Sequence, residues 1–226
     1  MLRGQDARGK CYRLRAAPWF ILRLALLVGS CSPIPRPGGR VQGCLMIVRL
    51  FRRKSDGQAF ALYGAIVAQA RQPAFYARMS VPDTVEGRFD MIVLHMVLIF
   101  HRLKDEGPAV AEEAQILFDL FMSDMDRSLR EMGVGDLTVP KKMKKLAAAF
   151  YGRLAGYTTA LDAGDIPSLS ETLGRVLHDG KPPEEGHTGQ LARYMVAAFA
   201  ELVTQSPAEI LAGQPRWPDA DSFTGA

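Results

Sequence analysis

The sequence predicts an all-α fold: a single-domain bundle of about six helices, with an N-terminal extension that is not part of its core. Three observations support this prediction. Apolar residues recur every three or four positions along most of residues 46–226. Glycine and proline separate these periodic stretches, as turns between helices require. Neither an alternating strand pattern of useful length nor an Asn-Gly hairpin signal occurs in residues 46–226.

Residues 1–45 differ in composition from the rest of the chain. The 226 residues carry a formal charge of +4, but the first 45 hold eight Lys or Arg and a single acidic residue, Asp6. The remainder is therefore mildly acidic, which is not the composition of a general nucleic-acid binder, and specific DNA binding is not expected. We divide the chain into a basic extension, 1–45, and a helical domain, 46–226.

The extension has three interpretations. Its apolar stretch, residues 18–31, is short and contains Arg23. It is a poor transmembrane helix, because about 20 apolar residues are needed to cross a bilayer. Since Met46 is a second plausible start, the extension is either spurious or disordered, an organelle presequence, or an export signal. All three cysteines lie within it, which excludes a disulfide framework and a thiolate metal site from the domain.

Turn residues bound the predicted helices. Asp83 or Thr84 can cap a helix whose centre is apolar almost all round, and which we expect its neighbours to bury. Gly133 supplies a left-handed end to the amphipathic helix that precedes it, and Pro140 suits the first position of the next helix. The stretch from Gln214 is expected to be extended. The predicted helices span Gln58–Gln72, Ala74–Met79, Val85–Lys104, Ala109–Met132, Pro140–Gly164, Ser168–His178 and, capped by Thr188, the residues to Gln205.

Three aspartates on one predicted helix, Asp119, Asp124 and Asp126, resemble a metal-binding carboxylate cluster. At about 100° per residue, Asp119 and Asp126 share a face, whereas Asp124 lies well round the helix. The spacing of Asp126 and Arg130 suits an ion pair between residues four apart, which is ordinary surface chemistry. We therefore predict no metal and no other cofactor. The sequence contains neither a phosphate-binding loop nor a recognisable Ser-His-Asp arrangement, so it gives no indication of an enzyme.

Four lysines crowd the first turn of the helix that Pro140 opens: Lys141, Lys142, Lys144 and Lys145. A helix N-terminus already carries partial positive charge, so these lysines destabilise it unless negative charge offsets them. The offset is either local, from Asp126, Glu131 and Asp136, or it comes from an anionic partner. An acidic protein, lipid headgroups and ribosomal RNA are the partners that this charge suits.

Two long, irregular stretches carry a resemblance to a known family. The first comprises Ile66–Tyr76, Val81–Asp90 and His95, and the second comprises Asp124–Asp136, Val139–Lys145 and Phe150–Arg153. Together they resemble the ubiquinol–cytochrome c chaperone family, over roughly Tyr63 to Tyr157. The resemblance implies an assembly factor and not an enzyme. It implies that the protein binds newly made cytochrome b and holds it for assembly into ubiquinol–cytochrome c reductase, respiratory complex III.

The resemblance also bears on location and further partners. From Met46 on, the chain is short like the bacterial members of the family. We therefore favour the bacterial cytoplasm, with a peripheral position at the inner membrane, over the mitochondrial matrix and inner membrane. A small partner subunit, the ribosome and an anionic membrane surface remain open as further partners.

The turn between the aspartate-bearing helix and the lysine-bearing helix is the predicted binding surface. Four methionines flank it, and methionine side chains repack easily around variable apolar clients. The residues predicted to contact a partner are Asp124, Asp126, Arg127, Arg130, Glu131, Asp136, Lys141, Lys142, Lys144 and Lys145. The alternative function is a metal- or isoprenoid-binding helical enzyme that uses Asp119, Asp124 and Asp126.

Overall fold

The structure is a computed structural model that describes residues 45–178 and 187–223, with side chains in 57–178 and 188–223. All of these residues belong to one unit of the chain, Val41–Ala226. The predictions for the N-terminal extension therefore fall outside the described residues, except at Leu45, where the first helix begins.

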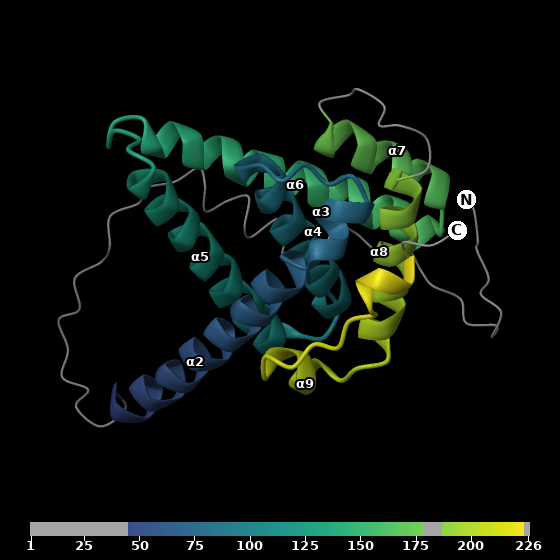
Figure 1. The fold of residues 1–226 in the computed structure, drawn as a ribbon. Helices are drawn as coiled ribbons and strands as arrows, with labels where there is room; N and C mark the ends of the chain where they lie inside the picture. Colours follow the sequence, from purple (N-terminus) through teal and green to yellow (C-terminus); the bar gives the residue numbers. More distant parts are fainter. Residues whose placement is uncertain (1–44, 179–186, 224–226) are drawn as a thin grey trace, which may run out of the picture. The chain divides into compact units, whose positions relative to one another are not determined.

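Helices joined by short turns make up the described part of the chain, which contains no strand (Figure 1). Six helices have twelve residues or more, so the predicted all-α bundle of about six helices is confirmed. None of the described helices is both long and apolar enough to cross a membrane. The elements are α2 (Leu45–Ala70), α3 (Pro73–Arg78), α4 (Val85–Leu103), α5 (Pro108–Glu131), α6 (Val139–Ala163), α7 (Ile166–Leu177), α8 (His187–Val203), α9 (Pro207–Leu211) and the 3₁₀ helix η1 (Ala220–Phe223).

Helix α4 is the centre of the core. Every residue from Asp90 to His101 is buried, as the nearly continuous apolar sequence of this helix predicts. Helices α2, α5, α6, α7 and α8 all contact it. Burial of its apolar side chains by five neighbours supplies the hydrophobic free energy that holds the bundle together.

Several helix ends have the predicted chemistry. The side chain of Thr84 caps α4 by accepting a hydrogen bond from the backbone N–H of Gly87, at 3.1 Å. After α5 the chain turns at Gly133, which has a φ of 79°, and α6 ends at Gly164, with a φ of 63°. Both values lie in the left-handed region, where glycine has no steric penalty.

Other boundaries differ from the prediction. Helix α2 begins at Leu45 instead of Gln58 and runs through Gly57, because one glycine within a helix costs only about 1 kcal/mol. Thr188 does not cap α8: it lies inside the helix, and its Oγ1 accepts a hydrogen bond from Ser170 Oγ on α7, at 2.9 Å. Helix α9, which was not predicted, follows α8, and the stretch from Gln214, expected to be extended, contains no helix until η1.

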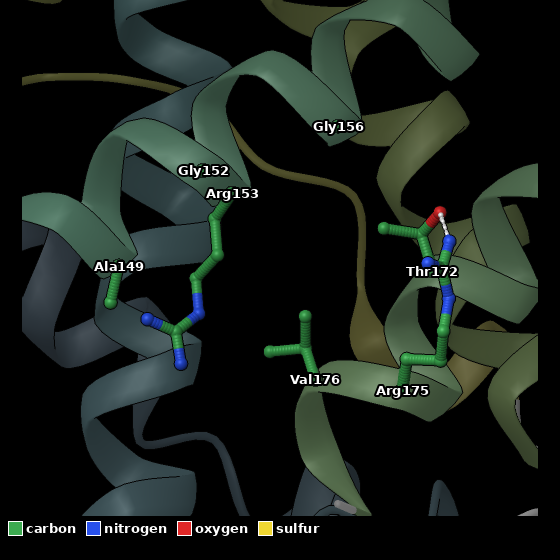
Figure 2. A pocket seen from close by; sticks show the side chains of 7 residues that line it. All are labelled: Ala149, Gly152, Arg153, Gly156, Thr172, Arg175 and Val176. Atoms are coloured by element: carbon green, nitrogen blue, oxygen red, sulfur yellow. Dashed lines mark hydrogen bonds between the residues drawn. The ribbon is translucent and has the colours of Figure 1, made fainter. Parts of the chain in front are cut away.

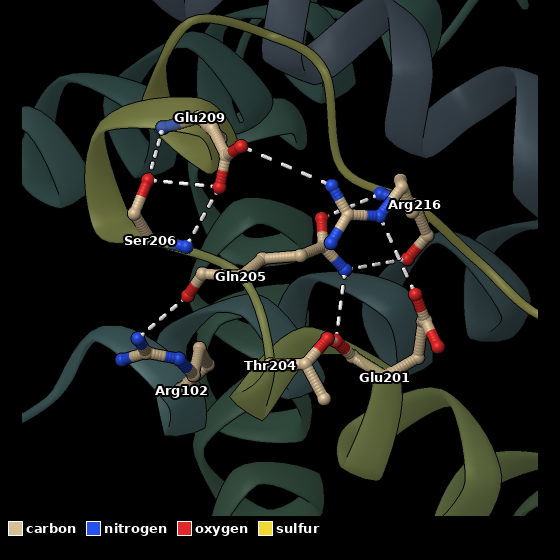
Figure 3. Close-up of polar contacts among 7 residues, drawn as sticks. All are labelled: Arg102, Glu201, Thr204, Gln205, Ser206, Glu209 and Arg216. Carbon is tan, nitrogen blue, oxygen red and sulfur yellow. Dashed lines mark hydrogen bonds and ion pairs between the residues drawn. The ribbon is translucent and has the colours of Figure 1, made fainter.

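The C-terminal segment is fixed to the bundle through the side chain of Gln205, which is 1% exposed (Figure 3). Its amide donates to the carbonyl oxygens of Glu201 and Arg216, at 3.0 Å each, and its Oε1 accepts from the Arg216 N–H, at 2.7 Å. Arg102 on α4 donates to the backbone oxygen of Gln205, at 2.8 Å. Ser206 and Glu209 form a capping box that starts α9, a signal the sequence contains as Ser-x-x-Glu.

A buried histidine joins α4 to α2 and α8. His95 is fully buried, and its Nδ1 lies 2.8 Å from the Met91 carbonyl oxygen, which can only accept, so Nδ1 carries the proton. Nε2 then accepts from the Tyr194 hydroxyl, at 2.8 Å, and that hydroxyl accepts from Gln69 Nε2, at 3.0 Å. Burial lowers the pKa of His95 to about 4. The neutral imidazole is therefore the native form.

The unfolding free energy should decrease as the pH is lowered, because His95 resists protonation in the folded protein. Its folded pKa of about 4 lies below the unfolded value of 6.5, so the unfolded chain binds more protons between these pH values and stability falls as pH falls through them. From pH 7 to pH 5 this histidine alone should remove about 2 kcal/mol of unfolding free energy. Urea unfolding of the wild type and of His95→Gln at both pH values measures it. Other groups cancel in the comparison, and equal pH dependence of the two proteins would contradict the assignment.

Two helical glycines should respond to alanine in opposite directions. A Cβ at Gly87 would meet the Pro82 carbonyl oxygen at 2.0 Å, whereas a Cβ at Gly64 meets nothing within 4 Å. Gly87→Ala should therefore lower the unfolding free energy by about 1–3 kcal/mol. Gly64→Ala should raise it by about 0.5–1 kcal/mol, because alanine loses less entropy on entering a helix. Chemical denaturation of the two variants measures both changes.

Candidate partner-binding surface

Residues 124–145, which we call the charged turn, form the predicted binding surface. They run from the last two turns of α5 to the first turns of α6, at the end of this helix pair farthest from α8 in Figure 1. The backbone is held by hydrogen bonds from Gly133 to the Arg130 carbonyl, at 2.9 Å, and from Val134 to the Leu129 carbonyl, at 3.1 Å. Val139 is 1% exposed and anchors the start of α6. The charged side chains thus stand on a defined backbone.

Two arginines pair with the four acidic groups of the charged turn. Arg130 Nε lies 2.7 Å from Asp126 Oδ2, as the spacing of four predicts, and Arg130 Nη1 contacts Asp136. Arg127 Nη2 lies 2.7 Å from Asp124 Oδ1, and its Nε lies 3.8 Å from Glu131 Oε1. The structure therefore brings the six predicted Asp, Glu and Arg residues into two ion-pair clusters.

Asp124 also has a structural role. Its Oδ2 accepts a hydrogen bond from the Tyr63 hydroxyl, at 2.9 Å, which joins α5 to α2. Burial and this hydrogen bond raise the pKa of Tyr63 well above its usual value. The Asp124 side chain is 26% exposed, against 39% for Asp126 and 85% for Asp136. Asp124 is thus the least accessible of the three to a partner.

The four lysines stand outside the ion pairs of the charged turn. All are exposed, and none forms an ion pair with a residue that the structure describes. The first turn of α6 contains no acidic residue, and the Thr138 side chain makes no capping hydrogen bond. Asp126, Glu131 and Asp136 are engaged by arginines, and none forms an ion pair with a described lysine. The four carboxylates of the charged turn exceed its two arginines by two charges, so local acids offset the four lysines only in part. The positive charge at this helix end faces solvent.

Two apolar side chains project from the charged turn. Leu137 is 99% exposed and Met132 is 55% exposed, although both are large and hydrophobic. Three further methionines are partly exposed: Met122 and Met125 on α5 and Met143 on α6. The methionines were predicted to flank the surface, whereas Leu137 was not singled out. An apolar residue in a segment of Gly, Asp, Thr and Pro is the signal that identifies it.

The three aspartates of the alternative function do not converge. Asp119 accepts a hydrogen bond from Gln115, at 2.7 Å, while Asp124 and Asp126 are bound by different arginines. Within residues 57–178 and 188–223, no group of three His, Cys, Asp or Glu side chains could hold a metal ion. The geometry therefore gives no support to a carboxylate metal centre on α5.

A buried ion pair connects the two sequence stretches that carry the family resemblance. Asp90 Oδ1 on α4 and Arg153 Nη2 on α6 lie 2.5 Å apart, and their side chains are 6% and 16% exposed. The guanidinium also stands over the Phe89 ring, 5.3 Å from its centroid. Sequence reasoning did not find this pair, because residues 63 positions apart leave no local spacing pattern.

A shallow groove of about 400 Å³ lies beside this pair, between α6 and α7. Gly152 and Gly156 form one wall, and the absence of their side chains creates the space (Figure 2). On the opposite wall Arg175 donates to Thr172 Oγ1, at 3.3 Å. The groove is a second surface feature of α6, two turns beyond the charged turn.

Comparisons with known proteins agree with this architecture. The family model described as "Ubiquinol-cytochrome C chaperone" matches residues 77–217. A solved structure, "Crystal structure of the Cbp3 homolog from Brucella abortus", shares 43% identity and a TM-score of 0.70 over 77% of this chain and 98% of that one. The ubiquinol-cytochrome c reductase complex assembly factor 1 of mouse and that of human are each 24% identical over 160 residues, which is 70% of this chain.

These comparisons define the class of protein and then its family. The chain is an all-α bundle that is similar in fold to one solved chaperone homologue and in sequence to assembly factors of a respiratory complex. The chain belongs to the ubiquinol-cytochrome c chaperone family. It spans about half the length of the curated relatives it matches, 54% of the mouse protein and 53% of the human one. The predicted family resemblance is confirmed.

The buried pair and the surface pairs should differ in their contribution to stability. Removing Arg153 by Arg153→Met leaves the Asp90 carboxylate buried without its counterion, which should cost about 3–5 kcal/mol of unfolding free energy. Arg130→Met should have a far smaller effect, because its carboxylate partners remain solvated. Urea denaturation at pH 7 compares the two variants, and equal losses would contradict the distinction between structural and available charges.

Proposed function

We propose that this protein is an assembly chaperone for ubiquinol–cytochrome c reductase, respiratory complex III, and that its client is newly made cytochrome b. The observation that carries the proposal is membership of the ubiquinol-cytochrome c chaperone family, over residues 77–217. The mouse and human relatives are assembly factors of the ubiquinol-cytochrome c reductase complex by name. The 43% identity to the Brucella protein favours a bacterial setting, with the chaperone acting in the cytoplasm at the inner membrane.

The physical task is to shield apolar segments. Cytochrome b is a bundle of transmembrane helices, each with about 20 apolar residues, and such segments aggregate when they are exposed before insertion. A helical chaperone can hold an apolar segment against an adaptable methionine-rich surface, since methionine repacks with little penalty. The role needs binding and release only, so we propose no catalytic residue.

The charged turn is the surface that we assign to this binding. Met132 and Leu137 offer apolar contact at its tip. On the same turn, Asp126, Arg130 and Asp136 add polar groups whose geometry the ion pairs fix. Such a polar rim supplies specificity, because a wrong partner leaves charges unpaired. The lysines add positive charge for an anionic partner.

Replacing the polar rim should reduce complex III without unfolding the protein. The variant is Asp126→Asn, Arg130→Gln and Asp136→Asn in the full chain, expressed in place of the wild type. These groups are exposed, so the thermal midpoint should stay within a few degrees of the wild type. We expect complex III, measured as ubiquinol-dependent cytochrome c reduction in membranes, and recovery of cytochrome b with the tagged protein both to fall several-fold.

A matched control is available in another exposed arginine–aspartate pair. Arg88 Nε lies 2.7 Å from Asp83 Oδ1 at the start of α4, and both side chains are more than half exposed. Asp83→Asn with Arg88→Gln removes similar charges from another part of the surface and should leave complex III unchanged. Normal complex III in the folded triple variant would contradict the assignment of the charged turn. Normal complex III in a strain that lacks the protein would contradict the function itself.

A further inference from the structure

The charged turn combines two features that rarely occur together on a surface that faces only water. Leu137 exposes 99% of its side chain at the tip of the loop, where no described element covers it. Four lysines follow within eight residues, on the first two turns of α6, and none is paired with a described acidic group. An apolar tip beside a group of cations is typical of segments that lie in the interface of a membrane.

The acidic groups of the same turn do not prevent approach to a negative surface. Asp136, next to Leu137, contacts Arg130, and Asp126 shares that arginine. Arg127 binds Asp124 and lies close to Glu131. With these acids balanced in part by two arginines, the lysines leave the charged turn with a net positive charge.

We propose that the charged turn, when no client occupies it, docks on an anionic lipid bilayer, with Leu137 and Met132 inserted among the acyl chains and the four lysines against the headgroups. The lysines lie on α6, directly after the inserted tip of the loop. Their long apolar stems can therefore extend along the bilayer interface and place the ammonium groups at the lipid phosphates. Each lysine near an anionic surface contributes about fivefold in binding, and the attraction weakens as salt rises.

The apolar tip distinguishes a bilayer from other polyanions. RNA would satisfy the lysines, but it offers no hydrocarbon phase to Leu137, which would remain in water. A lipid interface satisfies both parts of the surface at once. The inference rests on the proposed function only in taking the charged turn as a binding surface, and it places that surface where an apolar client must be delivered.

A local probe is needed, because the basic N-terminal extension would itself attract anionic vesicles. The full chain is prepared with its three native cysteines replaced by serine and with a single cysteine, Leu137→Cys, labelled with an environment-sensitive fluorophore. A second protein carries the label at Val85→Cys, which is an equally isolated exposed apolar position, 61% exposed, at the start of α4. Vesicles of phosphatidylcholine alone and of phosphatidylcholine with 30% phosphatidylglycerol are then added.

The label at position 137 should gain emission at least twofold and shift to the blue with the anionic vesicles only. At position 85 the emission should not change. Lys141→Gln, Lys142→Gln, Lys144→Gln and Lys145→Gln together should abolish the response at position 137. Replacing two cations elsewhere, Arg71→Gln and Arg193→Gln, should leave it intact.

The proposal would be overturned by an unchanged label at position 137, by an equal change at position 85, or by a response that survives loss of the four lysines. A change with single-stranded RNA but not with vesicles would overturn it in favour of a nucleic-acid surface. The vesicles contain no protein, so these outcomes are independent of the cytochrome b experiment. A chaperone that binds its client but not lipid would fail only here.

Discussion

The burial of α4 on every side is the constraint on which the rest of the structure depends. A helix that is apolar round its whole circumference can be stable in water only if other helices cover each face, and five helices do so here. The polar side chains that α4 carries into this core then need partners of their own. His95 finds Tyr194, and Asp90 finds Arg153. The positions of α6 and α8 follow from these contacts as well as from apolar packing.

The charges of the molecule fall into two groups with different physical roles. The Asp90–Arg153 pair is buried, where an unpaired charge is costly, so both members are fixed by the fold. Apart from Asp124, which Tyr63 holds, the charges of the charged turn are largely solvated, contribute little to stability and are accessible to a partner. A family resemblance in sequence does not separate these groups, since Arg153 and Lys145 both lie in the same resembling stretch. Only their burial does.

Local chemistry explains which parts could be predicted from the sequence. The Thr84 cap, the left-handed Gly133 and the Asp126–Arg130 pair depend on residues within five positions of each other, and each has the expected geometry. The Asp90–Arg153 pair and the His95–Tyr194 hydrogen bond depend on which helices become neighbours, which no local pattern encodes. Helix α9 was not predicted, although the Ser206–Glu209 capping box that starts it is a local pattern in the sequence.

The charged turn shows the same limit in its own details. The sequence identifies the lysines and predicts the Asp126–Arg130 pair, but it does not reveal that Arg130 also engages Asp136. Arg130 engages both Asp126 and Asp136, and the lysines form no ion pair with a described acidic group. The exposure of Leu137 likewise depends on the path of a loop between two packed helices. Both features matter for partner binding, and neither follows from the local sequence.

The buried ion pair also sets the direction in which the lysines point. An α-helix turns by 100° for each residue, so a register error of one position at Arg153 would rotate the whole of α6 by more than a quarter of a circle. The contact of Arg153 with Asp90, together with the buried apolar side chains of α6, fixes the rotation of α6 about its axis. Lys145 lies eight residues before Arg153 on the same helix, so the rotation of α6 also determines the direction of its side chain. A salt bridge in the interior therefore helps to determine which way the lysines face on a surface about 12 Å away along the helix.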